Sequence, residues 1–272
     1  MIIRLSGADF SANNIGKIDI KELTDETKTI LMNFTRSITT QQKYALQDFI
    51  SGMKDKGLYE LVDNLYLPVL MGSVGEALIN IKTLSVDGNA DNGGYVISGN
   101  NGLKKQTGDI ATVNISENNI NYHIFAYNTE PYDFEQLNGT QRYFYADKAL
   151  DGVRRMVDFN ITGIGGTTAR FGTKIDGNMT ISNSAYLASA QKLQGFVFNN
   201  GVPVIVGASI YKCNVTIPSS YDYSNLALQI LAMYTSDVSQ VGFGLLSIGK
   251  GLSNEQIVEY QNLVDIFMAN FI

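Results

Sequence analysis

The chain has very few of the residues that carry most metal and nucleophilic chemistry. Its 272 residues include one cysteine, one histidine, four prolines and no tryptophan. A single cysteine excludes an intrachain disulfide framework and a cysteine-based zinc site. A single histidine excludes a histidine-rich metal site and leaves His123 as the one imidazole for acid–base chemistry. We therefore expect a protein that is not an enzyme, with no cofactor and no metal, and we assign no catalytic, cofactor-binding or metal residues.

Charge is also sparse, and its balance is unfavourable for binding nucleic acid. Charged residues make up 17% of the chain, and 20 Lys+Arg stand against 26 Asp+Glu, for a formal net charge of −6. Because affinity for nucleic acid comes largely from cations that neutralise phosphates, we expect no nucleic-acid partner. No apolar run approaches the ~18 residues of a membrane-spanning helix, so we expect no membrane insertion. The opening Met1-Ile2-Ile3-Arg4 lacks the pattern of a signal peptide.

The chain does have enough apolar residues for a large core, arranged in three regions. A hydrophobic content of 44% excludes global disorder. Residues 1–22 are mixed and turn-rich, and we predict an N-terminal anchoring arm that packs on the rest of the chain or docks on a partner. Residues 23–82 have helical periodicity and are predicted to be a helical assembly segment. Residues 83–272 are predicted to be a β-sandwich with a C-terminal helix.

Helix starts are the clearest local signals. Thr39 with Gln42, and Ser253 with Gln256, each match a capping box, in which two side chains satisfy the first free N–H groups of a helix. The second box predicts a C-terminal helix with an apolar stripe. The helices predicted in the assembly segment run from Thr24 or Asp25 to Phe34, Thr40 to Lys56, Leu58 to Leu65, and Ser73 to Asn80.

Short strands separated by glycine- and asparagine-rich turns predict the sandwich. The turns Asp176-Gly177 and Asn200-Gly201 are the strongest hairpin signals, since type I′ turns need positive φ at both central residues. Many short strands favour a mainly β jelly-roll sandwich over βαβ units. The predicted strands are Tyr95–Ser98, Ile120–Tyr127, Gln141–Ala146, Met156–Ile161, Ala169–Phe171, Asn178–Ile181, Gly195–Phe198, Ile205–Lys212 and Leu226–Tyr234.

Each motif that suggests chemistry also has an ordinary structural interpretation, which we favour. His123 lies in a predicted strand without an obvious catalytic partner, and Cys213 is expected to be a small strand residue. The turn Asp87–Gly93 has Asx residues but misses the glycine and glutamate of an EF-hand loop, and calcium binding there stays open. The remaining candidates are a carboxylate group at Glu130, Asp133 and Glu135, which a glycosidase would need as a pair, and the glycine-rich turn Gly163–Thr168.

Aromatic side chains are the one feature that favours recognition of a ligand. The chain has 15 Tyr and 13 Phe, and tyrosine together with Asn and Asp is typical of sugar-binding faces and of protein interfaces. Half-buried tyrosines on strands are an equally ordinary explanation. The tyrosines in question are Tyr122, Tyr127, Tyr132, Tyr143, Tyr145, Tyr186, Tyr211, Tyr221 and Tyr223.

Three stretches resemble known families, two of them families of bacteriophage virion proteins. Residues 39–67 resemble a helix-and-turn motif of phage and prophage structural proteins, residues 243–260 look like the close of concanavalin A-like (laminin-G-like) domains, and residues 5–16 are similar to the start of virion proteins of Bacteroides-infecting (crAss-like) phages. Tyr59 replaces the tryptophan that is frequent in the first motif. The residues that match the first motif are Lys54, Gly57, Leu58, Leu61, Asp63, Leu65 and Tyr66.

The resemblance implies a structural component of a virion, of head-fibre or tail-fibre type, assembled in the bacterial host cytoplasm. The arm would contact other capsid or tail proteins, the chain would be a homo-oligomer, dimer or trimer, and the concanavalin-like jelly roll would bind a host-surface or mucus glycan. Two alternatives remain open: a glycan-cleaving depolymerase on the same scaffold, and a cellular carbohydrate-binding lectin.

Overall fold

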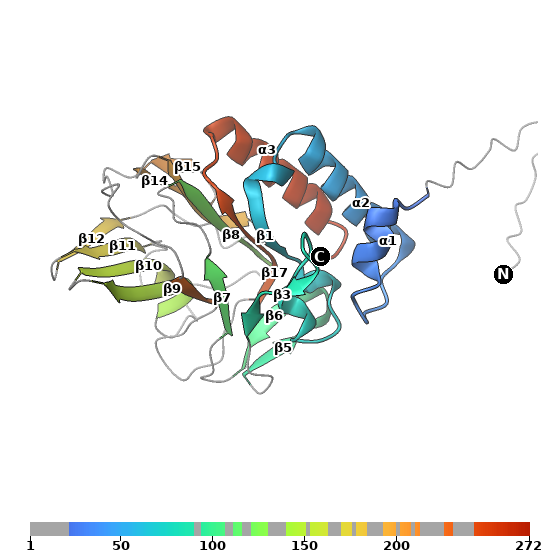
Figure 1. The fold of residues 1–272 in the computed structure, drawn as a ribbon, viewed down its shortest axis with the longest axis horizontal. Coiled ribbons are helices and arrows are strands. Elements are labelled where there is room, and N and C mark those ends of the chain that lie inside the picture. The colour runs from blue at the N-terminus through green and yellow to red at the C-terminus, as the bar shows by residue number, and fades with distance from the viewer. Residues whose placement is uncertain are drawn as a thin grey trace, which may run out of the picture.

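The protein is described from a computed structural model, in which helices and two large antiparallel sheets form layers (Figure 1). The helices are α1 (Asp25–Leu31), α2 (Thr40–Asp55) and α3 (Asn254–Met268), with short 3-10 turns η1 (Tyr59–Leu61), η2 (Pro68–Leu70), η3 (Glu76–Leu78) and η4 (Gly99–Asn101). The structure describes residues 22–89, 94–106, 111–115, 121–129, 140–150, 153–162, 170–175, 178–183, 193–199, 202–207, 210–212, 226–230 and 242–272.

One sheet, here called the inner sheet, lies between the helices and the other sheet. Its strand order is β15–β14–β13–β8–β17–β6–β5, and β1 also pairs with β17. All of these pairs are antiparallel. The strands are β1 (Val62–Tyr66), β5 (Tyr95–Ile97), β6 (Leu103–Lys105), β8 (Tyr122–Asn128), β13 (Leu193–Asn199), β14 (Val202–Val206), β15 (Ile210–Lys212) and β17 (Gly242–Lys250).

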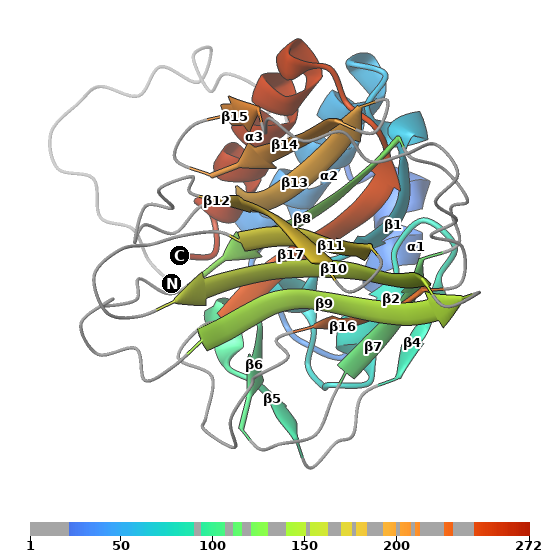
Figure 2. The ribbon, with the colours of Figure 1, turned by 90° about the vertical axis from the view of Figure 1, so that its left-hand side faces the viewer.

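The second sheet, here called the outer sheet, has the order β12–β11–β10–β9–β16–β7–β4 and is also antiparallel. Figure 2 shows it in front of the inner sheet, with α2 and α3 behind. Its strands are β4 (Gly88–Asn89), β7 (Ala111–Ile115), β9 (Thr140–Leu150), β10 (Val153–Thr162), β11 (Arg170–Ile175), β12 (Asn178–Asn183) and β16 (Leu226–Ile230); a separate hairpin pairs β2 (Ile79–Asn80) with β3 (Ser85–Val86).

Burial along the inner sheet explains this arrangement. Every residue of β8 is buried, and β17 is buried from Gly242 to Gly249. An antiparallel sheet with one wet face would alternate buried and exposed residues, so both faces of the inner sheet must be covered. The helices cover one face and the outer sheet the other, which makes the domain a β-sandwich with helices on one side (Figure 1).

The predictions from local sequence signals are largely confirmed. Both capping boxes are present, at Thr39 and Ser253. Register pairs flank the two predicted hairpin turns, Ile175 with Asn178 and Asn199 with Val202. A further two-residue connection joins Leu150 to Val153 across Asp151-Gly152, a hairpin signal that the sequence analysis passed over.

The predicted helix over residues 58–65 is wrong. After Gly57, whose φ of +66° closes α2, the chain makes the short turn η1 and then the strand β1, which pairs with β17. Val62, Leu65 and Tyr66 are fully buried there. Leucines three and four residues apart suit a helix, but burial in the inner sheet determines the outcome, as tertiary context often overrides local preference.

Three further boundaries differ from the sequence analysis. The predicted helix over 73–80 is only η3 followed by β2, and the first helix ends at Leu31 instead of Phe34. The predicted strand 205–212 is a hairpin, in which Val206 of β14 pairs with Ile210 of β15. The division of the chain at residues 22 and 82 stays a prediction, although β1 already belongs to the inner sheet.

The apolar face of α2 is buried within the chain. Leu46, Phe49, Ile50 and Met53 are at most 2% exposed and belong to one hydrophobic core with β1, β8, β17 and α3. An assembly role for residues 23–82 would need apolar surface that the chain leaves uncovered. This face of α2 is covered within the chain and does not provide it.

We expect Ser253→Ala to lower the free energy of unfolding by about 1 kcal/mol, because the alanine cannot cap α3. The Ser253 hydroxyl accepts a hydrogen bond from Gln256 N at 3.3 Å, and the Gln256 side chain accepts one from Ser253 N at 2.9 Å. Urea denaturation of both proteins measures the difference. Ser253→Asp is the control, since aspartate also caps; an equal loss in both variants would contradict a role for the cap.

Candidate functional site

His123 lies inside the core and not in a cleft. It is fully buried on β8, where its ring lies 5.0 Å from Phe125 and 6.1 Å from Tyr260 of α3. Nδ1 donates to the carbonyl of Lys250 at 2.6 Å, so the proton is on Nδ1, and Nε2 accepts from the Ser247 hydroxyl at 2.8 Å. Burial lowers the pKa of His123 from 6.5 to about 4, although the hydrogen bond to Lys250 raises it.

This histidine therefore has a structural role. The Tyr260 hydroxyl is buried beside Ser247, but the two groups do not reach hydrogen-bonding geometry. A serine and a histidine in contact suggest nucleophilic chemistry. Here Ser247 and Tyr260 are also fully buried, so substrate cannot reach the pair. The ordinary interpretation of His123 is the one that the geometry supports.

The described part of the Asx-rich turn 87–93 is occupied by internal hydrogen bonds. Asp87 Oδ2 accepts from Asn80 at 2.9 Å and from Asn64 at 3.3 Å, while Oδ1 accepts from Ser85 at 2.5 Å. Both oxygens thus hold the β2–β3 hairpin against β1. Residues 90–93 lie outside the described part, and no group of three or more His, Cys, Asp or Glu among the described residues is arranged to hold a metal ion.

Most other candidates cannot be placed. Cys213, the carboxylates Glu130, Asp133 and Glu135, and the turn 163–168 lie outside the described residues. Tyr122 and Tyr127 are buried on β8 and form no recognition face. Of the other tyrosines, Tyr143, Tyr145 and Tyr211 are described only by their backbone, and Tyr132, Tyr186, Tyr221 and Tyr223 lie outside the described residues.

The best-defined open site among the described residues is a groove of about 340 Å³ between α2 and α3, here called the helix groove. Its lining residues recur every three or four positions on each helix, so one face of α2 meets one face of α3. Sequence analysis predicted both helices and their apolar stripes, but not that the stripes face each other. The lining residues are Gln41, Tyr44, Ala45, Asp48, Phe49, Leu263, Ile266, Phe267 and Asn270.

The helix groove has an apolar floor and a polar rim. Phe49 and Phe267 stack at the floor with ring centroids 4.8 Å apart. Gln41 Nε2 donates to Asn270 Oδ1 at 3.1 Å and bridges the two helices at the rim. Farther along, a Cβ added to Gly52 would lie 2.6 Å from Leu263, so this glycine allows the helices to pack closely.

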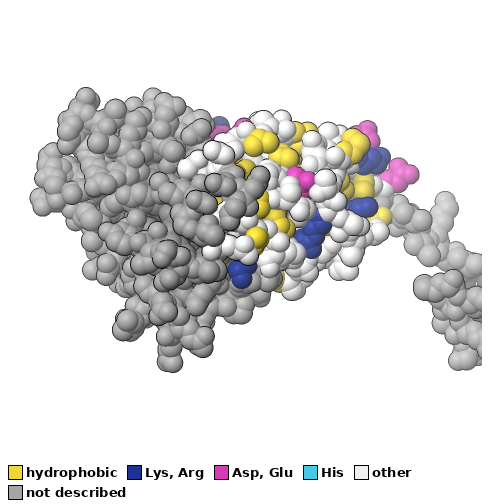
Figure 3. All heavy atoms as spheres, turned by 90° about the horizontal axis from the view of Figure 1, so that it is seen from below, with side chains coloured by type: hydrophobic (Ala, Val, Ile, Leu, Met, Phe, Trp, Pro, Cys, Tyr) yellow, Lys and Arg dark blue, Asp and Glu magenta, His cyan; other side chains and the backbone are white. Residues whose placement is uncertain are grey.

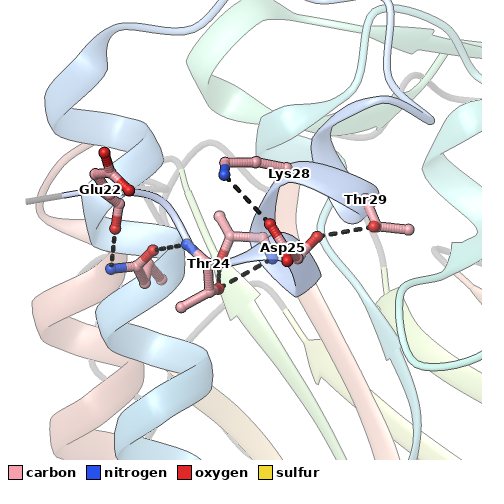
Figure 4. A network of polar contacts seen from close by, with 7 residues as sticks. Glu22, Thr24, Asp25, Lys28 and Thr29 are labelled. Atoms are coloured by element: carbon pink, nitrogen blue, oxygen red, sulfur yellow. Dashed lines mark hydrogen bonds and ion pairs between the residues drawn. The ribbon is translucent and has the colours of Figure 1, made fainter.

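A second groove, of about 440 Å³, adjoins the start of the described chain. Gln47 of α2 ties that start down, since it accepts from Thr24 N at 2.6 Å and donates to the Glu22 carbonyl at 3.4 Å (Figure 4). Met32 in the lining is 78% exposed. Figure 3 shows side chains of both charges at the α1 end of the molecule. The lining residues are Leu23, Lys28, Leu31, Met32, Arg36, Ser37, Ile38 and Lys43.

Arg36 and Lys82 are cations that bind backbone carbonyls of neighbouring segments. Arg36 donates to the carbonyls of Val69 and Gly99, at 2.5 and 2.7 Å, and also to the Asn100 side chain. Lys82 donates to the carbonyls of Tyr59 and Val62 and lies 4.4 Å from the Tyr59 ring.

No helix among the described residues has the length and apolar content to cross a membrane.

Comparison with known proteins identifies the fold but no family. No protein-family model and no curated protein matches the chain. Domain 4 of AbnA, a GH43 extracellular arabinanase from Geobacillus stearothermophilus, in complex with arabinotriose, matches with a TM-score of 0.54 and 14% identity, over 74% of this chain and 98% of that one. Trypanosoma rangeli sialidase matches with a TM-score of 0.53 and 11% identity, over 84% of this chain but only 40% of the sialidase.

These likenesses, at such low identity, concern the fold. The chain is a β-sandwich of the kind found in an arabinotriose-bound domain of a glycoside hydrolase and in part of a sialidase. The resemblance to phage virion proteins rests on sequence motifs alone.

Proposed function

We propose that this chain is a carbohydrate-binding protein without catalytic activity, built on a concanavalin-like jelly roll. The observation that carries the proposal is the fold match to AbnA domain 4, which extends over 98% of that domain and concerns a structure with arabinotriose bound. The one histidine is enclosed, which argues against its use as a general base.

We further propose, from the sequence motifs, that it serves in a bacteriophage virion as a head-fibre or tail-fibre component. In this role the arm 1–22 would contact capsid or tail proteins, and the glycan would be on the host surface or in mucus. Mass spectrometry of purified particles is the test: the peptides of this chain should co-purify with the particle. Their absence from particles would favour the cellular lectin instead.

We expect the purified chain to bind oligosaccharides on a glycan array without shortening them. The array should include arabinotriose and bacterial capsular polysaccharides, and chromatography of each bound glycan after incubation measures cleavage. Chain shortening that disappears in a Glu130→Gln, Asp133→Asn or Glu135→Gln variant would establish the depolymerase alternative. If the protein binds no glycan on the array, the proposed function is contradicted.

A further inference from the structure

We propose that the second groove, beside α1, binds a peptide segment of a partner protein in which carboxylates flank apolar side chains. We call it the basic groove, because Lys28, Arg36 and Lys43 line it. The proposal goes beyond carbohydrate binding and does not depend on it. Figure 1 shows α1 at the end of the molecule away from the outer sheet, so the partner would dock far from that sheet.

The basic groove contains apolar surface that the chain leaves uncovered. Met32, which follows the last residue of α1, is 78% exposed, more than any other large hydrophobic residue described. Leu31 and Ile38 beside it are only partly buried. Covering such side chains on binding is favourable, and the flexible methionine adapts to the shape of a partner. This surface differs in that respect from the apolar face of α2, which the core covers.

The lysines of the basic groove are poorly compensated by the chain itself. The Lys28 ammonium lies 3.3 Å from a carboxylate oxygen of Asp25, but the Asp25 side chain is 98% exposed, so water screens the pair (Figure 4). The Lys43 ammonium has no ion pair or hydrogen bond with the described residues. Both lysines can therefore attract the carboxylates of a ligand.

Arg36 is fixed in position but keeps an uncompensated charge. Its guanidinium donates from Nη1 to the carbonyls of Val69 and Gly99, at 2.5 and 2.7 Å, and from Nη2 to the Asn100 side chain. These acceptors are neutral, and burial lowers the pKa of Arg36 without a described carboxylate to oppose it. Donors on Nε and Nη2 have no further acceptor in the described part of the chain. A carboxylate is the acceptor that suits a guanidinium best.

The start of α2 adds to the positive potential. A helix has partial positive charge at its first turn, which acidic side chains normally offset. Asp25 and Glu26 do so in α1, whereas the first turn of α2 has no acidic residue and Lys43 follows it directly. Because charges more than about 10 Å apart are largely screened at physiological salt, this local excess matters more to a docked segment than the net charge of −6.

An acidic and apolar peptide fits this groove better than other anionic ligands do. Every lining residue stays partly exposed, whereas small-molecule sites usually enclose most of the ligand. The lining residues, all of them described, include no aromatic side chain on which a sugar ring could stack. A flat bilayer does not enter a concave groove, and nucleic acid would use the cations alone. A peptide with apolar and acidic side chains uses both parts of the groove, as in recognition of amphipathic helices.

A displayed library of random peptides, selected on the immobilised full chain, tests the ligand class. We expect enrichment of peptides that combine Asp or Glu with Leu, Ile, Met or Phe. Fluorescence anisotropy with synthetic copies then measures their affinity, which should fall as salt increases because the contacts at the rim are ionic. No enrichment, or enrichment of basic peptides, would overturn the proposal.

Variants locate the site. Met32→Ser and Lys43→Glu should each weaken binding of the selected peptides about tenfold or more, since one removes an apolar contact and the other reverses a charge. Val86→Ser is the control for the first, because Val86 is 63% exposed on β3. Lys56→Glu is the control for the second, at the opposite end of α2. Both controls should bind like the unmodified chain, and equal affinity of all four variants would show that the groove is not the site.

Two further measurements test other occupants of the basic groove. In analytical ultracentrifugation, Met32→Ser should leave the mass of the full chain unchanged; an oligomer that this variant dissociates would show that a second copy fills the groove and would overturn the proposal. Flotation with phosphatidylglycerol vesicles should recover no protein. Vesicle binding that Lys43→Glu abolishes would identify a membrane surface instead. The glycan array is read separately, so failure of peptide binding leaves the proposed function unaffected.

Discussion

Gly195→Ala is expected to lower the free energy of unfolding by at least about 3 kcal/mol, or to prevent folding, as overpacking that displaces backbone can. A Cβ at this position would lie 2.0 Å from the carbonyl oxygen of Ile124 and 2.9 Å from Cα of Phe125. Both atoms belong to the backbone of β8, which cannot move aside without separating from β13. The φ of +153° adds strain, because residues with a side chain rarely adopt it.

Urea denaturation, or soluble yield if the variant does not fold, measures this effect. Gly75→Ala is the matched control, since Gly75 has φ of −61° and a Cβ there would meet no atom within 4 Å. That change should leave stability unaltered or raise it slightly, because alanine reduces the freedom of the unfolded chain. Similar stabilities for the two variants would contradict the close approach of β13 and β8.

Sequence analysis predicted a strand at Gly195 but not the need for glycine. That need arises from Ile124, which is far away in the chain and becomes a neighbour only when β13 pairs with β8. The helix groove was missed for the same reason: its floor joins Phe49 of α2 to Phe267 of α3, and no periodicity within one helix indicates which other helix it will contact.

Features encoded over a few residues were predictable. Thr39 and Ser253 each form a capping box with a residue three positions later. The hairpin turn at Asp176-Gly177 was predictable because these two residue types favour the positive φ angles that such a turn requires. In contrast, residues 58–65, which include most of β1, were predicted to be helical, and Leu58, Leu61 and Leu65 do have helical spacing. Its partner strand β17 lies nearly two hundred residues later in the sequence, so no short stretch around β1 shows that it is a strand.

Acid should destabilise the protein through His123 before it does so through the carboxylates. The unfolded chain takes up a proton on this histidine below pH 6.5, whereas the folded chain resists protonation until about pH 4. The contribution of His123 to the free energy of unfolding is therefore fully present above pH 6.5 and is lost as the pH decreases toward 4. From pH 7 to pH 5 the loss should be about 2 kcal/mol, with each pKa unit equivalent to about 1.4 kcal/mol.

Urea denaturation at pH 7, 6 and 5 should show this slope in the unmodified chain and a much flatter profile in His123→Gln. Glutamine is neutral throughout and can still donate to Lys250 or accept from Ser247. Glu76 does not obscure the result. Burial tends to raise the pKa of Glu76, but its bonds from Gly72 and Thr35 lower it below 4.5, so its contribution is lost only at more acidic pH.

His123 and Glu76 lose their contributions to stability over different pH ranges, which makes this prediction specific. His123 is the only histidine of the chain, so a slope between pH 7 and pH 5 has no other histidine to account for it. If His123→Gln kept the full slope, the histidine would have to be accessible in the folded chain, and its contacts with Ser247 and Lys250 would be wrong. A flat profile in both proteins would mean that folding leaves the pKa of His123 unchanged. Either result would contradict the packing of α3 over β8, because Tyr260 of α3 helps to exclude water from this imidazole.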